Sequence, residues 1–181
     1  RLALGHVNED QFTELLIAEQ DQNTAYLIYG MPDLIGTGVS EAQVVFHGDE
    51  GGDFGAAMTL MDLNGDGLDE VVVSAPDVNT NVSSAGKVSV FDGAALQHEH
   101  LASQASLILT GAANMGSSKS GKALASGDVN GDGFADLLIG APQADAPNSD
   151  SGAVFLWNGS DDPFVGEIGL EEAQAHFRGS Q

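Results

Sequence analysis

An internal repeat is the feature that most limits what this chain can fold into. The segment LMDLNGDGLDEVVVSAP at residues 60–76 returns as SGDVNGDGFADLLIGAP at 126–142, 66 positions later. A weaker copy, LGHVNEDQFTELLIA, occupies residues 4–18, and EAQVVFHG at 41–48 returns as EAQAHFRG at 172–179. The mean period is about 60 residues, so three periods use up the 181 residues. Such a period indicates an array of similar structural units, which we place at 1–53, 54–119 and 120–181.

Short apolar runs occur four times in each unit, with Gly, Asp, Asn or Pro at their ends. Runs of this length between turn residues are typical of β-strands and are too short for ordinary helices. Short helical turns near 92–97 and 170–175 stay open. The expected strands are Leu2–Leu4, Leu15–Ala18, Ala25–Tyr29 and Ala42–Phe46 in the first unit, Ala57–Met61, Val71–Ala75, Lys87–Phe91 and Ser106–Thr110 in the second, and Lys122–Ala125, Leu137–Ala141, Ala153–Trp157 and Ala173–Phe177 in the third.

Four short strands per unit predict an all-β fold made of four-stranded antiparallel blades, the building blocks of a β-propeller. Three blades cannot close a ring, because propellers have about four to eight. Two interpretations remain: the chain, which starts at Arg1 without Met or a signal peptide, is a fragment of a longer propeller, or copies of it assemble. Further blades of the same chain or of a second copy are therefore expected partners, because unpaired blades expose edges and apolar faces.

The strongest chemical signal is a pair of Asp-rich loops between the first two strands of the second and third units. Oxygen-bearing side chains stand at the first, third, fifth and ninth positions, Gly stands at the sixth, and the seventh residue would offer its carbonyl oxygen. Hard oxygen ligands folded around a tight turn are what Ca²⁺ prefers. The expected calcium ligands are Asp62, Asn64, Asp66, Leu68 and Glu70 in one loop, and Asp128, Asn130, Asp132, Phe134 and Asp136 in the other.

Other interpretations of these loops are weaker. An EF-hand is excluded, since the loop is shorter, lacks the Glu at position 12 and is followed by a strand. Zinc or copper would want His or Cys, which neither loop contains. An unmetallated Asp/Asn-Gly turn remains the plain alternative. In the first unit His6 replaces the first Asp and Gln11 replaces the turn Gly, so we expect a strained turn and a weak or lost metal site at Asn8, Asp10, Phe12 and Glu14.

Composition excludes several functions. Five Lys and Arg against 27 Asp and Glu give a net charge of −22, which argues against nucleic acid and anionic membranes as partners. No apolar stretch is long enough for a transmembrane helix. The absence of Cys removes disulfides, thiol catalysis and Cys-ligated zinc.

The second and third units resemble a known family. Phe54-Gly55, the Asp-rich loop and Ser74-Ala75-Pro76 are similar to an FG-GAP repeat, and so is the third unit, where Ser120-Gly121 replaces the FG pair and Gly140-Ala141-Pro142 follows the loop. Such repeats occur in integrin α-subunit propellers and in many bacterial secreted proteins. The resemblance implies a calcium-bearing propeller that binds ligands on the face opposite the metal loops, here at Asp49–Asp53, Asp77–Ala85, Ala112–Ser120 and Gln143–Ser151.

Several short patterns match motifs of other functions, but their context argues against those functions. The stretch 116–122 fits GxxxxGK, but a strand rather than a helix should follow it, so it is not a nucleotide-binding loop. Ser84–Lys87 fits SxxK on a turn, without the companion β-lactamase motifs. His98-Glu99-His100 is expected to be a solvated loop. Phe155 and Trp157 are expected in the core rather than on a sugar-binding surface.

These observations predict a non-enzymatic, Ca²⁺-binding propeller segment of a secreted, extracellular or cell-surface protein. Its role would be adhesion, or recognition of a protein or carbohydrate ligand. Two alternatives stay open: a non-catalytic propeller portion of a secreted hydrolase or lyase, and a purely structural spacer.

Overall fold

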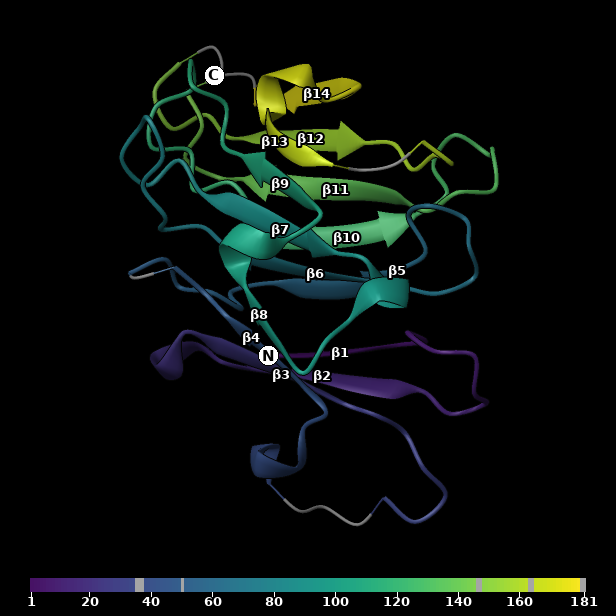
Figure 1. The fold of residues 1–181 in the computed structure, drawn as a ribbon. Coiled ribbons are helices and arrows are strands. Elements are labelled where there is room, and N and C mark those ends of the chain that lie inside the picture. The colour runs from purple at the N-terminus through teal and green to yellow at the C-terminus, as the bar shows by residue number, and fades with distance from the viewer. Residues whose placement is uncertain (35–37, 50, 146–147, 163–164, 180–181) are drawn as a thin grey trace.

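The computed structural model describes residues 1–34, 38–49, 51–145, 148–162 and 165–179, and these residues form an all-β fold. Fourteen strands build three sheets that follow one another in chain order (Figure 1). The described residues include no α-helix, and none of their helical segments has the length and apolar character needed to cross a membrane.

All twelve predicted strands are confirmed, two of them with the predicted bounds and the others with bounds shifted by one or two residues. Neighbouring strands within each set of four are antiparallel. The first sheet contains β1 (Leu2–Gly5), β2 (Glu14–Glu19), β3 (Thr24–Ile28) and β4 (Val44–His47); the second contains β5 (Met58–Met61), β6 (Glu70–Ala75), β7 (Lys87–Phe91) and β9 (Leu107–Thr110); the third contains β10 (Ala123–Gly127), β11 (Asp136–Ala141), β12 (Ala153–Trp157) and β14 (Ala175–Arg178).

Two further strands were not predicted, and each joins a sheet that belongs to the preceding unit. β8 (Glu99–Leu101) pairs in parallel with β4, and β13 (Gly166–Gly169) pairs in parallel with β9. The first two sheets therefore have five strands, and only the third has the expected four. The sequence hides these strands because they are short and mostly polar, and backbone pairing at a sheet edge leaves no hydrophobic pattern.

The interpretation of His98-Glu99-His100 as a solvated loop is wrong for its last two residues, which lie on a strand, although Glu99 is exposed. His100 lies on β8, and its ring stacks on Phe46 with centroids 5.5 Å apart and planes 15° apart. Burial lowers the pKa of His100. The histidine is thus part of the packing between the first and second sheets.

The core consists of two apolar layers, one on each side of the second sheet. In β6, Val71 and Val73 pack toward the first sheet while Val72 packs toward the third, and all six residues of the strand are buried. In the first and third sheets, the corresponding strands β2 and β11 instead contain both buried and partly exposed residues. The second sheet is therefore covered on both faces, and each outer sheet on one.

The structure also tests the predictions about the buried aromatic residues and the short helical turns. Phe155 and Trp157 are buried in the layer between the second and third sheets, as predicted. Single 3₁₀ turns occur at both places where a helical turn stayed open. Among the described residues, others lie between β2 and β3, between β3 and β4, and between β8 and β9. These turns are Gln20–Gln22, Val39–Glu41, Gly93–Ala95, Ala102–Gln104 and Leu170–Glu172.

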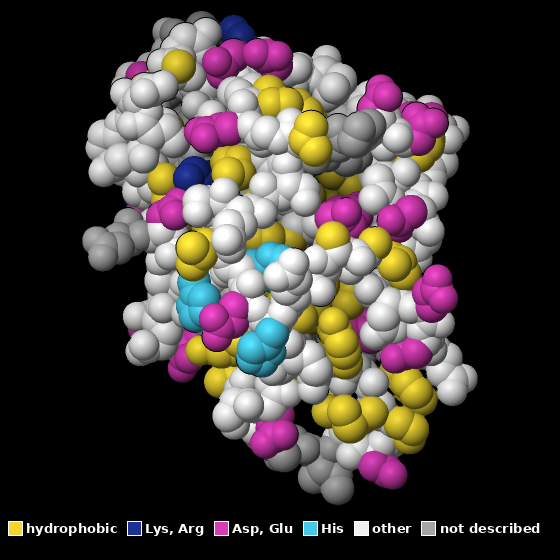
Figure 2. All heavy atoms as spheres, viewed as in Figure 1, with side chains coloured by type: hydrophobic (Ala, Val, Ile, Leu, Met, Phe, Trp, Pro, Cys, Tyr) yellow, Lys and Arg dark blue, Asp and Glu magenta, His cyan; other side chains and the backbone are white. Residues whose placement is uncertain are grey.

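The GxxxxGK and SxxK stretches have structural roles in the fold. The GxxxxGK stretch ends at β10, a strand, and its Ser118 and Ser120 are buried. Lys87 of the SxxK stretch forms an ion pair with Asp49 at 2.8 Å. The acidic excess is a surface property: Figure 2 shows Asp and Glu side chains spread over the visible face with few Lys or Arg among them.

Candidate metal centre

The three loops that connect the first and second strands of the sheets are neighbours along one end of the molecule, on the right in Figure 1. A hydrogen bond that recurs at the repeat period joins them. The eighth residue of each later loop donates its amide to the carbonyl of the first residue in the preceding loop: Asp69 to His6 at 2.6 Å and Ala135 to Asp62 at 3.2 Å. The loops are thus held in a row.

The loop at 62–70 folds around its own first carboxylate. The Asp62 carboxylate accepts hydrogen bonds from the amides of Gly65 and Gly67, at 2.7 and 3.0 Å. Both glycines have positive φ, 76° and 90°, a conformation that costs Gly little and other residues more. Asp66 accepts from the Leu68 amide at 2.8 Å. Acids at the first and fifth positions therefore hold the turn through hydrogen bonds to its backbone amides.

Glu70, at the ninth position, is buried beneath the loop and accepts hydrogen bonds from it. It is only 3% exposed, and its carboxylate accepts from the Leu63 amide at 2.7 Å and from the Asn64 side-chain amide at 3.0 Å. Burial, together with the nearby carboxylates of Asp66, Asp62 and Asp92, raises the pKa of Glu70 to about 7, although the Leu63 hydrogen bond opposes this. A cation beside Glu70 would relieve the cost of its charge.

Asp92 is a candidate ligand that the sequence reasoning missed. It follows β7, and carboxylate oxygens of Asp66, Glu70 and Asp92 lie within 4.8 Å of one another. The repeat alignment holds a signal for it: Phe91-Asp92-Gly93 of the second unit returns as Trp157-Asn158-Gly159 in the third. An oxygen-bearing side chain therefore follows the third strand in both units with intact loops.

The loop at 128–136 repeats this arrangement. Asp128 accepts from the Gly131 and Gly133 amides, at 2.7 and 3.1 Å. Asp136 is fully buried and accepts from the Val129 amide at 2.8 Å and the Gly159 amide at 3.0 Å.

Asn158, the counterpart of Asp92, leaves a buried oxygen without a partner. Its Oδ1 is buried and has no hydrogen-bond donor among the described residues. A buried carbonyl oxygen without a donor is costly. A bound cation beside the loop would give this oxygen a partner, so the residues present fit a metal ion.

The loop at 6–14 keeps the buried ninth-position acid but lacks the first-position carboxylate around which the other two loops fold. Glu14 is fully buried and accepts from the Val7 amide at 2.8 Å and the Asn8 side chain at 3.2 Å, as Glu70 does in its loop. The first position holds an imidazole, and Nδ1 of His6 lies 3.0 Å from the carbonyl oxygen of Phe12. Because that carbonyl can only accept, the ring donates to the oxygen that the other loops would offer to a cation.

The expectation of a strained turn in this first loop is wrong. Gln11 is absent from the residues with positive φ, whereas its counterparts Gly67 and Gly133 have φ of 90° and 96°. The backbone conformation therefore differs at the sixth position, although the carboxylate of Asp10 accepts from the Phe12 amide at 2.7 Å as Asp66 does from Leu68. The loop also lacks a carboxylate or amide oxygen after its third strand, because Tyr29 stands there in the place of Asp92 and Asn158.

At the opposite end of the molecule, the described residues form three lysine–aspartate ion pairs. Lys87 pairs with Asp49 at 2.8 Å, Lys119 with Asp77 at 2.7 Å, and Lys122 with Asp53 at 3.6 Å. Within the segments expected to bind a ligand, Glu50 and residues 146–147 lie outside the described residues.

Comparisons with known proteins agree with the repeat pattern. The FG-GAP repeat family matches residues 54–91 and 120–157. Integrin alpha-5 of Xenopus laevis is 32% identical over 165 residues, which cover 87% of this chain and 15% of that protein. Integrin alpha-PS5 of Drosophila melanogaster is 39% identical over 131 residues, 71% of this chain and 12% of that protein.

A phosphatidylinositol-glycan-specific phospholipase D of Bos taurus is 26% identical over 190 residues, 97% of this chain and 22% of that protein. The chain thus spans less than a quarter of the length of each of these relatives. Residues 54–91 and 120–157 are therefore FG-GAP repeats, in a chain that is similar to integrin α subunits over most of its length.

Proposed function

We propose that this chain is a calcium-binding β-propeller segment of an extracellular or cell-surface protein that takes part in adhesion or recognition. One observation carries the metal proposal: two loops present alternating oxygen groups above a buried ninth-position acid, and a further oxygen-bearing side chain follows the third strand. All these groups are hard oxygen donors, which suit Ca²⁺ better than zinc or copper.

Each residue of a loop would have a distinct task. Asp62, Asn64, Asp66 and Glu70 would supply side-chain oxygens and Leu68 its carbonyl, with Asp128, Asn130, Asp132, Phe134 and Asp136 as their counterparts. Bound calcium would fix the connection between the first two strands of a blade and neutralise carboxylates that otherwise repel one another. Calcium in extracellular fluids is high enough to fill even weak sites of about 10⁻⁴–10⁻³ M affinity.

The propeller part of the proposal rests on the three consecutive sheets and the FG-GAP repeats. The units 1–53, 54–119 and 120–181 would each supply one blade of a larger ring. The innermost strand β5 of the second sheet lies beside β1 of the first sheet and β10 of the third, as radial blades require. Recognition would use the end opposite the metal loops, where the three lysine–aspartate ion pairs stiffen the connections between strands.

A non-enzymatic role is supported by the integrin α relatives. The similarity to a phospholipase D, which extends over 97% of this chain, favours a second candidate: a non-catalytic propeller portion of a secreted hydrolase. A structural spacer is the third possibility. Probing protein and glycan arrays with the chain separates recognition from the other two, since a spacer or an accessory blade should bind no array component reproducibly.

The metal proposal is tested by thermal unfolding with calcium, with magnesium and with chelator. Calcium at 100 times its dissociation constant should stabilise the chain by about 2.7 kcal/mol per site. Magnesium should give a smaller gain, since it demands a tighter octahedral shell. A melting temperature that neither calcium nor chelator changes would contradict the proposal.

A further inference from the structure

The chain between β7 and β9 leaves the second sheet and places β8 along the edge of the first sheet (Figure 1). β8 has three residues, of which Glu99 and Leu101 are exposed and His100 is partly buried. Its backbone pairing with β4 is short, and the Val45 amide donates to the His98 carbonyl beside it at 2.9 Å. Within β8, the side chain of His100 is therefore the one that packs inward.

The ring of His100 lies against two buried phenylalanines. It stacks on Phe46 of β4 with centroids 5.5 Å apart, and Phe91 of β7 meets it edge-on with centroids also 5.5 Å apart and planes 62° apart. The two phenylalanine rings contact each other at 4.8 Å and are almost fully buried. Because Phe46 belongs to the first sheet and Phe91 to the second, the histidine ring joins the two sheets.

One hydrogen bond of this ring requires the neutral imidazole. Nε2 of His100 accepts from the Gln97 backbone amide at 2.8 Å. A protonated ring carries an N–H at both nitrogens and cannot accept. Burial lowers the pKa of His100 from its ordinary 6.5. Because a backbone amide can only donate, the Gln97 contact acts in the same direction as burial and favours the neutral ring.

The acids around β8 offer a protonated His100 no direct partner. Asp92 follows β7 and Glu99 lies on β8 itself, and both line a pocket of about 280 Å³ with His100. In the described part of the chain, no hydrogen bond or ion pair joins either carboxylate to the ring. The 3₁₀ turns on either side of β8 contain no titratable side chain. A proton on the ring would therefore place an unpaired charge against two apolar rings.

Two other histidines lie beside β8, and Figure 2 shows histidine side chains gathered on this face of the molecule. His47 lies opposite Leu101 in the pairing of β4 with β8. Nδ1 of His98 lies 2.8 Å from the Gln43 carbonyl oxygen, to which a neutral and a protonated ring can both donate. Of the described histidines around β8, His100 is thus the one with a hydrogen bond that protonation must break.

We propose that β8 is released from β4 when His100 takes up a proton, so that this contact between the first two sheets opens in mild acid. A released histidine has the ordinary pKa of 6.5, which is higher than the pKa of the attached ring. The attachment is therefore complete above pH 6.5 and weakens as pH falls toward the pKa of the attached ring. Release would uncover the faces of Phe46 and Phe91 that the histidine ring covers.

The test measures amide hydrogen exchange by NMR from about pH 7.5 to about pH 5, as protection relative to the intrinsic rate at each pH. The Val45 amide, which donates to the His98 carbonyl, reports on β8. Because the released state binds one more proton, its protection should fall about tenfold for each pH unit between 6.5 and the pKa of the attached ring. The Ser74 amide, which donates to Ala57 within the second sheet at 3.0 Å, should keep its protection.

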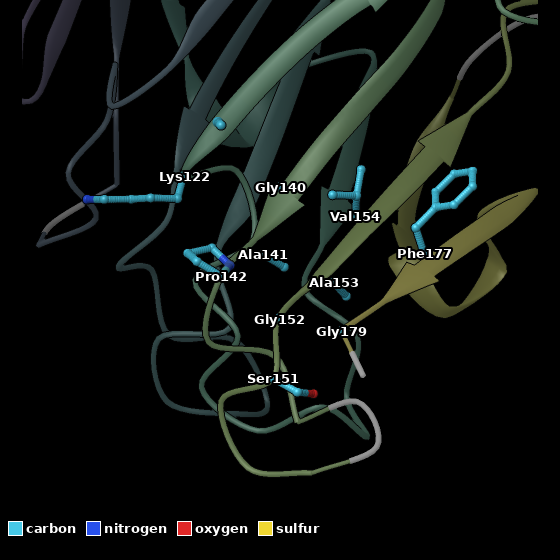
Figure 3. A pocket seen from close by; sticks show the side chains of 11 residues that line it. Lys122, Gly140, Ala141, Pro142, Ser151, Gly152, Ala153, Val154, Phe177 and Gly179 are labelled. Carbon is cyan, nitrogen blue, oxygen red and sulfur yellow. The ribbon is translucent and has the colours of Figure 1, made fainter. Parts of the chain in front are cut away.

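The third sheet supplies a second reference amide. The Gly121 amide donates at 3.0 Å to the carbonyl of Gly140, which lines a pocket of about 520 Å³ between β11, β12 and β14 (Figure 3). None of the described residues that line this pocket is His, Asp or Glu. Protection that falls equally at Val45, Ser74 and Gly121 would show acid unfolding of the whole chain, and would overturn the proposal.

His100→Phe keeps an apolar ring against Phe46 and Phe91 but cannot take up a proton. The protection of Val45 in this variant should not depend on pH, whereas the control His98→Gln should keep the dependence of the unsubstituted chain. Dependence that persists in His100→Phe, or disappears in His98→Gln, would overturn the proposal. So would a His100 ring that titrates at or above pH 6.5 in the unsubstituted chain, which is measured without any variant.

All measurements are made in chelator and repeated with calcium. The proposed release depends on His100 and not on a metal ion, so it should be seen in chelator. The calcium proposal depends instead on stabilisation by calcium at constant pH. Failure of one is thereby kept distinct from failure of the other.

Discussion

The loops at 6–14 and 62–70 make the same connection between two strands, yet only the second has the features of a cation site. Both bury a ninth-position glutamate that accepts from the second-position amide and from the third-position asparagine. They differ at the first position, at the turn glycine and after the third strand. The ninth-position acid and the asparagine therefore belong to the hairpin itself, and the other three features distinguish a metal loop.

The largest expected effect on stability comes from removing the buried ninth-position acid, which all three loops have. Asp136→Ala would leave the buried amide of Gly159 and the partly buried amide of Val129 without acceptors, at about 1–3 kcal/mol for a buried group. We expect a loss of about 4 kcal/mol in urea unfolding with chelator present, and a similar but smaller loss for Glu14→Ala. Glu167→Ala, on an exposed residue of β13, is the control. Equal losses in the control and in Asp136→Ala would contradict the anchor role.

The second prediction concerns the pH dependence of the calcium-free protein. The pKa of Glu70 is about 7 in the folded state against an ordinary 4.5, so the folded state binds more protons between these values. The stability that Glu70 contributes is complete below pH 4.5 and is lost as pH rises through 7, by at most about 3 kcal/mol.

Urea unfolding in chelator at several pH values measures this, with Glu70→Gln as the comparison. The neutral amide should remove the part of the slope that the carboxylate causes. Identical slopes for the two proteins would show that Glu70 does not titrate in this range.

The third prediction separates the two kinds of loop by their response to calcium. Asp62→Ala should lose one site, and with it about 2.7 kcal/mol of calcium stabilisation at 100 times the dissociation constant. In calorimetric melts this is a loss of about 5–10 °C from the calcium-induced gain. Asp10→Ala, the same type of substitution at the fifth position of the first loop, should leave that gain unchanged. An equal loss in both variants would show that the two loops do not differ in calcium binding.

The smallest expected effect comes from converting the first loop. His6→Asp combined with Gln11→Gly restores the first-position acid and the turn glycine, but Tyr29 still leaves no carboxylate or amide oxygen after the third strand. We expect a third, weak site that adds about 1 kcal/mol of stability at the same calcium concentration. A site as strong as the other two would show that the oxygen at Asp92 or Asn158 does not matter.

Sequence reasoning located most of the fold because the signals were local and repeated. Apolar runs such as Val71–Ala75 and Leu137–Ala141 lie on strands because turn residues punctuate them at one period. β8 and β13 escaped notice because their pairing depends on the edge that a neighbouring sheet presents. The strain expected at Gln11 was wrong because the backbone could change its path, which residue type alone does not reveal.

The site divides in the same way. The spacing of Asp62, Asp66 and Glu70 within one short segment allowed them to be predicted from the sequence. Asp92 is distant in the sequence and comes close to Asp66 and Glu70 only when the sheet folds. Comparing the ends of the third strands across units would have found it.

The most direct measurement is the calcium stoichiometry of the chelator-treated chain by isothermal titration calorimetry. We predict two sites per chain, one site in either Asp62→Ala or Asp128→Ala, and still two in Asp10→Ala. No binding, or a stoichiometry that neither Asp62→Ala nor Asp128→Ala lowers, would contradict the assignment of the two loops as calcium sites.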